Sequence, residues 1–335
     1  MVFAFRSALA LGLFAILACR AASATPRFDP VPYLHTQKRV AVGNGRHLNI
    51  YCTGRGSPAV VLDTSGDDGT AGWRLVQPEI ARHTRVCSYD PAGLGFSDAV
   101  AGARDAGTSA AELHELLRRA GVVAPVVLVG YAGSGLSARL YADRYPHDVA
   151  GLVLVAPDVP YQQQRISAIA PALEPALANG ARFAERCLAA AKRGAIRKDS
   201  PFAECMYAPP DPTMPAVLRN AIAKQWMRPS LWSVMVAREH GKDLSSAEVT
   251  REQRGYGRMP LVVLTTTKDI LMLPIPPAQR QRLAQAWMRW HDAVAALSSR
   301  GRNRLIEDAG QALPIERPAA VSAAIEGVLE ASRRR

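Results

Sequence analysis

Beyond residue 24 the sequence has no run of about 18 consecutive apolar residues, which is the length that a membrane-spanning helix needs. It also has no Cys-x-x-Cys pair of the kind that holds structural zinc. Acidic residues are in the minority, since 29 Asp and Glu stand against 41 Lys and Arg, a net charge of +12. The basic residues are scattered and no nucleic-acid motif accompanies them. We therefore predict no further membrane span, no metal, no cofactor and no nucleic-acid partner.

The chain has enough apolar residues for one large core, because 48% of its 335 residues are hydrophobic and only 21% are charged. Short apolar segments that read as strands alternate with segments of helical periodicity, which favours a mostly parallel sheet with helices on both faces. The predicted strands cover residues 40–42, 48–52, 59–63, 85–89, 126–130, 149–155, 260–264 and 303–307. Ser109 and Glu112 form a predicted capping box for a helix that ends at Gly121.

The first 24 residues have the features of a secretory signal peptide. Arg6 is followed by an apolar run from Ala8 to Ala18 and by the small-residue site Ala22-Ser23-Ala24. Cleavage after Ala24 predicts export to the periplasm or the medium. A lipoprotein anchor at Cys19 is the alternative, although the residues before Cys19 fit that motif poorly.

Four cysteines remain after the predicted cleavage, and an even count in an exported chain indicates disulfides. Three pairings are formally possible. Cys52 and Cys87 each lie in a predicted strand, whereas Cys187 and Cys205 lie close together further along the chain. The simplest pairs are therefore Cys52 with Cys87 and Cys187 with Cys205.

A strand, a sharp turn of small residues and a helix follow one another between Val126 and Tyr141. The turn has the glycine frame of a nucleophile elbow, G-x-S-x-G, in which strand and helix nearly touch. Upstream, the segment Asp90 to Asp98 reads D-x-x-G-x-G-x-S-D. Together these motifs resemble the α/β-hydrolase fold family, and the resemblance extends from about Gln37 to about Leu329.

The resemblance implies a catalytic triad in which two members have changed. Ala132 stands at the elbow position of the nucleophilic serine, and Gln311 stands where family members carry the histidine base. Neither a methyl group nor an amide supplies the chemistry of the residue it replaces. Asp269, in Thr266-x-x-Asp269, matches the acid position, with a surface turn as the plainer interpretation. Asp158 is the alternative acid.

The family's oxyanion loop corresponds to Ser65 and Gly66, and the amide of Gly133 would supply the second donor. A solvated turn explains the loop equally well. Ser134 lies two residues beyond the elbow apex, which disfavours it as a replacement nucleophile. His240 and His291 do not occupy triad positions, so each is predicted to be solvent-facing or structural.

Residues 158–257 interrupt the alternation of strands and helices and resemble the family's cap insertion. We expect core segments at 25–157 and 258–335 around this helical cap, whose predicted helical stretches are 166–191 and 216–238. The cap's aromatic and methionine residues either line a ligand pocket or pack within the cap. They are Trp226, Met227, Trp232 and Met235.

These features predict an exported α/β-hydrolase-fold protein that has lost ordinary hydrolase activity. It would bind a small apolar or acyl-type ligand, or a protein partner, without turning it over. The alternative is an active esterase-like hydrolase, or a lyase, that uses a different set of catalytic residues. The loss of the triad serine or histidine typically removes about 10⁴- to 10⁶-fold in rate.

Overall fold

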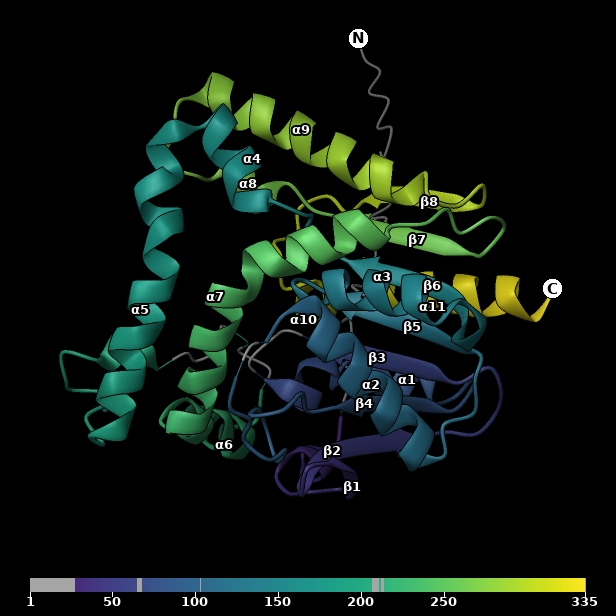
Figure 1. Cartoon of the computed structure of the whole chain (residues 1–335), viewed down its shortest axis with the longest axis horizontal. Coiled ribbons are helices and arrows are strands. Elements are labelled where there is room, and N and C mark those ends of the chain that lie inside the picture. The colour runs from purple at the N-terminus through teal and green to yellow at the C-terminus, as the bar shows by residue number, and fades with distance from the viewer. Residues whose placement is uncertain (1–27, 65–67, 103, 207–210, 212–213, 335) are drawn as a thin grey trace, which may run out of the picture.

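A computed structural model describes residues 28–64, 68–102, 104–206, 211 and 214–334. The predicted signal peptide, Cys19 within it, and the expected oxyanion residues Ser65 and Gly66 therefore lie outside the described residues. The described part forms one eight-stranded sheet in the order β1-β2-β4-β3-β5-β6-β7-β8, with helices on both faces (Figure 1). The strands are β1 (Lys38–Gly43), β2 (Arg46–Thr53), β3 (Val60–Thr64), β4 (Val86–Tyr89), β5 (Val126–Tyr131), β6 (Val149–Val155), β7 (Leu261–Thr265) and β8 (Gly301–Leu305).

Strand β2 pairs antiparallel with β1 and β4, and the remaining neighbours pair in parallel. The central strands β3, β5, β6 and β7 are buried along almost their whole length. Continuous apolar runs suit such strands because helices cover both faces of the sheet. This confirms the predicted α/β class with a mostly parallel sheet.

Strand β8 begins two residues earlier than predicted. Its pairing with β7 runs from Leu261 opposite Gly301 to Thr265 opposite Leu305. The strand is an exposed edge with the sequence GRNRL, so it lacks the apolar pattern that marks buried strands. Pairing with β7, and not its own composition, fixes its position.

Helix α2 (Ala106–Ala120) begins three residues before the predicted capping box. Asp105 is the N-cap: its carboxylate accepts from the Thr108 amide at 2.7 Å, and the Thr108 hydroxyl accepts from the Asp105 amide at 3.1 Å. The predicted box of Ser109 and Glu112 is thus wrong. The Thr108 hydroxyl plays the part that an acidic or amide side chain usually plays.

The other α-helices are α1 (Gln77–Ile80), α3 (Ser134–Arg144), α4 (Gln162–Ile169), α5 (Glu174–Lys192), α6 (Ala216–Trp226), α7 (Pro229–Glu252), α8 (Lys268–Leu271), α9 (Pro277–Ala295), α10 (Leu313–Glu316) and α11 (Pro318–Arg333). Short 3-10 turns cover Val31–Tyr33, Gly69–Trp73, Pro146–Asp148, Pro171–Leu173 and Ala203–Cys205. Among the helices of the described ranges, none has both the length and the apolar character to cross a bilayer.

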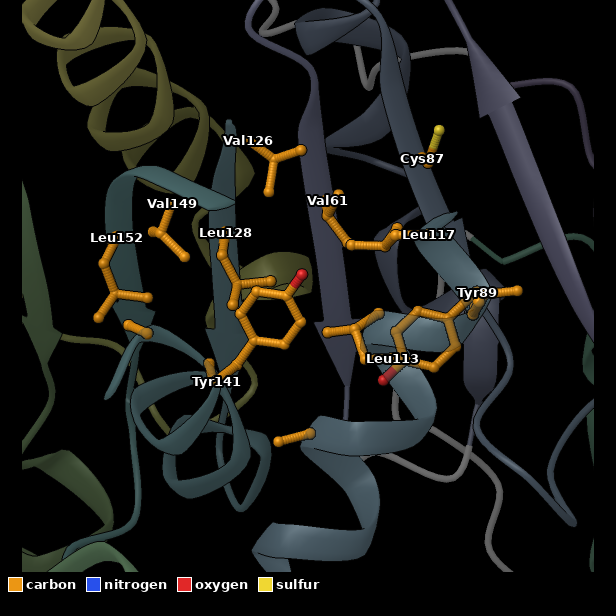
Figure 2. Packing of buried hydrophobic residues seen from close by; sticks show 14 of the residues in the cluster. Val61, Cys87, Tyr89, Leu113, Leu117, Val126, Leu128, Tyr141, Val149 and Leu152 are labelled. Atoms are coloured by element: carbon orange, nitrogen blue, oxygen red, sulfur yellow. The ribbon is translucent and has the colours of Figure 1, made fainter. Parts of the chain in front are cut away.

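Two apolar layers hold the helices to the sheet. On one face, α2, α3 and α9 pack on β-sheet residues such as Val61 and Leu128, with Leu113 and Tyr141 from the helices (Figure 2). On the other face, α11 and α1 cover β3, β5 and β6, and Ile325 is fully buried there. Because β3 to β8 pair in parallel, their carboxyl ends lie at the same edge of the sheet.

Helices α4 to α7 all lie between β6 and β7 in the sequence, and α7 lies between the sheet and α5 (Figure 1). Their buried apolar residues form a cluster that also includes Tyr33, Ala71 and Leu94 of the core. The Cys187–Cys205 disulfide lies within this insertion, whereas Cys52–Cys87 joins residues that face each other on β2 and β4. Both predicted cysteine pairs are therefore confirmed.

Candidate functional site

Strand β5 runs through a tight turn at Ala132 into α3, as the motif predicts. Ala132 has a positive φ of 52°, which is rare for a residue with a side chain. Its amide donates to the Val155 carbonyl at 3.0 Å, and its carbonyl accepts from the Gly135 amide at 2.9 Å. Such strain costs about 1–3 kcal/mol and persists because the surrounding hydrogen bonds fix it.

The small residues of the turn are required by packing. A Cβ atom on Gly130 would lie 2.8 Å from the Cβ of Ala138, and one on Gly135 would lie 2.6 Å from the Cβ of Pro157. Non-bonded carbon atoms do not approach each other so closely, so a side chain at either position would clash. Strand β5, helix α3 and the segment after β6 therefore approach one another at van der Waals contact around Ala132.

Ser134 is used to hold this turn together. Its hydroxyl accepts from the Tyr131 amide at 2.9 Å and lies within hydrogen-bond distance of the Tyr131 and Asp63 carbonyls, at 2.9 and 3.1 Å. These partners are backbone groups, whereas a nucleophilic hydroxyl is hydrogen-bonded to the base that activates it. The geometry agrees with the prediction that Ser134 is not a replacement nucleophile.

A cavity of about 300 Å³ opens directly beside Ala132. We call its strand-end side the floor, formed by Asp63, Ala132 and Asp158, and its α7 side the roof, formed by Met235, Arg238, Glu239, Lys242 and Ser245. The remaining lining residues are Thr64, Tyr89, Pro91, Arg104, Asp105, Ala106, Ser109, Gly133, Ser134, Leu136 and Ser137. The lining is rich in charged and hydroxyl groups.

Asp63 is the most deeply buried acid of the floor, with 2% of its surface exposed. Its carboxyl accepts from the Tyr89 hydroxyl at 2.6 Å and from the Ser137 hydroxyl at 3.3 Å. Burial raises the pKa of Asp63 to about 6, and the hydrogen bonds and the charge of Arg238 only partly oppose this effect. The Asp63 carboxyl therefore gains or loses its proton around a pH of about 6.

Asp158 flanks Ala132 on the other side, because β5 lies between β3 and β6 in the sheet. Its amide donates to the Ala132 carbonyl at 3.1 Å. Burial raises the pKa of the Asp158 carboxyl, while Lys242 and a hydrogen bond with Gln162 lower it. The alternative acid position is therefore part of the cavity floor.

The charges of the roof arise from one face of α7, where Arg238 and Lys242 are one helical turn apart. Lys242 also contacts Glu239 at 2.6 Å. On a third wall, Arg104 is held by Glu112 at 2.9 Å, and Glu112 also binds Arg46. The cavity thus has two acids on its floor and charges of both signs on its roof, because Glu239 lies on α7 with Arg238 and Lys242.

The other two triad-equivalent residues are brought together at the ends of β7 and β8. The Asp269 carboxylate accepts from the Gln311 amide at 2.7 Å, and Glu316 accepts from the Gly310 amide at 2.9 Å. Both Asp269 and Gln311 are exposed, and neither is among the described residues that line the cavity. Asp269 therefore holds the main chain of the loop rather than the Gln311 side chain.

Of the expected oxyanion donors, only Gly133 falls within the described residues, and it lines the cavity at the N-terminus of α3. Amides at a helix N-terminus favour negative charge. The pairing of Gly133 with a donor from the β3 loop stays a prediction.

The aromatic and methionine residues of the insertion were predicted either to line a ligand pocket or to pack within the cap. Trp226 and Trp232 pack against each other with ring centroids 5.4 Å apart and are buried within the insertion. Met235 lines the cavity, whereas Met227 is 38% exposed. The plainer interpretation, packing, holds for both tryptophans.

Two histidines have structural or surface positions. His291 is completely buried, within 2.7 Å of the Thr265 hydroxyl and 3.0 Å of the Pro157 carbonyl. Burial lowers the pKa of His291 to about 4, which favours the neutral ring. It supports the segment that precedes Asp158. His240 is exposed and lies 3.1 Å from Glu185.

Sequence reasoning did not single out Asp63, Arg238 or Lys242. One signal was available: Asp63 is an acid at the end of an otherwise apolar strand, Val60–Thr64. Such an acid is seldom fully buried without a purpose in packing or function. The basic pair on α7 gives no signal by itself, since charges four residues apart usually mark a solvated face.

The sequence comparisons support the fold. The family model for the alpha/beta hydrolase fold matches residues 53–196. A 2-hydroxy-6-oxo-2,4-heptadienoate hydrolase of Pseudomonas putida is 36% identical over 124 residues, which cover 35% of this chain and 43% of that enzyme. A 2-hydroxymuconate semialdehyde hydrolase of a Pseudomonas species is 33% identical over 123 residues, covering 35% and 42%. The chain thus spans less than half the length of these curated relatives.

Solved structures extend the likeness to most of the chain. An esterase from Thermogutta terrifontis superposes with a TM-score of 0.57 at 19% identity, covering 89% of this chain and 99% of that one. A variant epoxide hydrolase from Bacillus megaterium gives 0.62 at 15% identity, covering 88% and 100%. Sheet order, elbow and family match together show that the chain has the α/β-hydrolase fold.

Proposed function

We propose that this protein is an exported, non-hydrolytic binding protein that holds a small polar molecule in the cavity beside Ala132. One observation carries the proposal: the cavity is formed around an intact elbow, yet the residue at its apex ends in a methyl group. The backbone that would position a nucleophile is present without the nucleophile.

The loss of hydrolysis is supported by the second triad position. Gln311 cannot accept a proton near neutral pH, and the carboxylate of Asp269 is engaged by a main-chain amide. Ester hydrolysis through a serine needs a nucleophile and a base that act as a unit. We infer that ordinary esters are not turned over.

The cavity favours a polar ligand over the apolar or acyl ligand predicted from the sequence. Asp63, Asp158, Arg238 and Lys242 all reach the lining, and an apolar group placed against them would remove their solvation without replacing it. A volume of about 300 Å³ also lies at the small end for ligand sites, which disfavours long acyl chains.

Export is supported by the N-terminal sequence pattern and by the two disulfides. Structural disulfides form and persist in oxidising compartments such as the periplasm. We therefore propose a periplasmic or secreted location.

A second candidate, a lyase with non-standard catalytic groups, is favoured by Asp63. A buried carboxyl with a pKa of about 6 at a cavity wall has the properties of a general acid or base. In this interpretation Asp63 would take or give a proton, and no covalent intermediate would form.

The two candidates are separated by a binding screen followed by product analysis. We expect polar molecules of about ten heavy atoms to raise the melting temperature, and Ala132→Trp to abolish the shift by filling the cavity. Mass spectrometry should recover each stabilising compound unchanged. Recovery of a product would favour the lyase, and the absence of any stabilising compound would contradict the binding function.

A further inference from the structure

Another hollow, of about 380 Å³, lies at the opposite edge of the sheet from Ala132. Its lining residues directly precede β7 and β8 or follow α11, and they are Tyr256, Arg258, Met259, Arg300 and Arg334. Strands β5 to β8 run in parallel, so the amino ends of β7 and β8 lie away from the elbow, which follows the carboxyl end of β5. The hollow is therefore separate from the cavity described above.

This hollow carries an excess of positive charge. Three of its five lining residues are arginines, and no Asp or Glu is among the described residues of the lining. Within the described part of the chain, no carboxylate oxygen lies within 4.0 Å of the Arg258 or Arg300 guanidinium nitrogens. Arg334 contacts Glu330 at 3.0 Å, but both side chains are largely exposed, and such surface pairs are weak. All three guanidinium groups are therefore accessible to an anion.

The main chain holds Arg258 and Arg300 near each other. On one side of Arg258, Gly257 forms a β-bridge with Ser298, and on the other side the Met259 carbonyl accepts from the Ser298 hydroxyl at 2.5 Å. The Arg300 amide donates to the same hydroxyl at 3.1 Å. The two arginines thus extend from loops that are already bonded to each other, so a ligand between them would pay little for ordering the main chain.

The positive charge continues from the hollow along β8. Arg302 lies opposite Val262 and Arg304 opposite Leu264 in the pairing with β7. These two partners belong to the apolar layer beneath α11, so both arginines lie on the face of the sheet that α11 covers. Both are exposed. An anion that approaches the start of β8 therefore meets a positive potential that extends beyond the hollow itself.

The donors indicate the chemical class of the anion. Guanidinium groups stay charged at all physiological pH values and bind oxyanions through paired, charge-assisted hydrogen bonds. A terminal phosphate group has three acceptor oxygens and up to two negative charges, whereas a carboxylate has two oxygens and one charge. Three arginines around one hollow therefore match a terminal phosphate better than a carboxylate.

We propose that this hollow binds a terminal phosphate group, with Arg258 and Arg300 as the principal donors and Arg334 as the third. A volume of about 380 Å³ leaves room for part of the molecule that carries the phosphate. A soluble phosphate monoester and the head group of phosphatidic acid share this chemistry. The site goes beyond the binding function of the Ala132 cavity, and either proposal can fail without the other.

Isothermal titration calorimetry with inorganic phosphate tests the site, at an ionic strength held constant with sodium chloride. We expect the parent protein to bind phosphate, and the double variant Arg258→Gln with Arg300→Gln to bind it at least about tenfold more weakly, because two charged donors are lost. Circular dichroism verifies the fold, and Arg258→Gln alone replaces the double variant if that variant does not fold.

A matched control removes the same charge elsewhere. Arg197 and Arg282 are exposed and lie outside the lining, in the helical insertion and on α9. Arg197→Gln with Arg282→Gln should leave the phosphate affinity within about twofold of the parent value, because exposed charges at a distance are screened by salt. An equal loss of affinity in both double variants would show that net charge alone attracts phosphate, and it would overturn the site.

Cosedimentation distinguishes the two sources of the phosphate group. Phosphatidylcholine vesicles with and without phosphatidic acid are mixed with the parent protein and with both double variants. Retention on the phosphatidic acid vesicles that depends on Arg258 and Arg300 supports the site with a lipid head group as its ligand. Binding of inorganic phosphate without retention on vesicles supports a soluble phosphate compound. If the parent binds neither inorganic phosphate nor these vesicles, the proposal is wrong.

Discussion

The strand ends of this protein carry two polar sites that differ in burial. Around Ala132, Asp63 is enclosed and hydrogen-bonded within the cavity, and the backbone packs at contact distance. At the ends of β7 and β8, Asp269 and Gln311 are exposed. Side chains at an exposed loop can change with little effect on the fold, whereas the elbow is part of the core packing. The scaffold therefore retains the geometry of the elbow independently of the triad's chemistry.

The largest expected effect tests whether the elbow is fixed by packing. Gly130→Val should destabilise the fold by about 3 kcal/mol or more, because its side chain would overlap Ala138 and the turn cannot move away. Urea unfolding measures the change. Gly327→Ala in α11 is the control, since its added methyl meets nothing within 4 Å and should stabilise by about 0.5–1 kcal/mol. A fully stable Gly130→Val protein would show that the contact is not restrictive.

Repair of the triad tests whether the two sites still work together. Ala132→Ser alone should give almost no esterase activity, because Gln311, at the position of the triad base, cannot take the proton of the new hydroxyl. Ala132→Ser with Gln311→His should exceed it by about 100-fold, since Asp269 already lies beside residue 311. Chromogenic esters provide the measurement. Equal activity in the single and double variants would reveal a different base and would contradict our interpretation of Gln311.

The burial of Asp63 predicts a specific dependence of stability on pH. Its pKa is raised from 3.8 to about 6 in the folded state, so its contribution is fully present below about pH 4 and is lost as the pH rises through about 6. Asp63→Asn should therefore stabilise the protein by up to about 2–3 kcal/mol at pH 7.5 and have little effect at pH 4. The free energy of unfolding of both proteins, measured at pH 4 and at pH 7.5, tests this difference. A destabilised Asp63→Asn protein at pH 7.5 would indicate that Asp63 is held ionised.

The smallest expected effect concerns the apex of the elbow. Ala132→Gly should stabilise the protein by about 1 kcal/mol, because glycine adopts a φ of 52° without the strain that a Cβ brings. The gain is measured by thermal unfolding against Ala309→Gly, a buried alanine without a positive φ, which should lose stability. If both variants lose stability equally, the turn at Ala132 is not strained.

The sequence by itself determined the succession of the eight strands and the elbow, because each depends on local composition or on a recognisable turn. It favoured the two cysteine pairs among three possible pairings. Short apolar runs bounded by turn residues indicated buried strands, and the glycines around Ala132 indicated a sharp turn between a strand and a helix. The sequence also predicted the loss of both triad groups at Ala132 and Gln311. Those conclusions needed no knowledge of distant contacts.

Only the tertiary structure decided the character of the cavity. Asp63, Asp158 and Arg238 are far apart in the chain, and they meet because β3, β5 and β6 are neighbours and α7 packs over their ends. The position of β8 likewise depends on its pairing with β7. The type of each side chain follows from the sequence, but its burial, its pKa and the charges around it are properties of the folded structure.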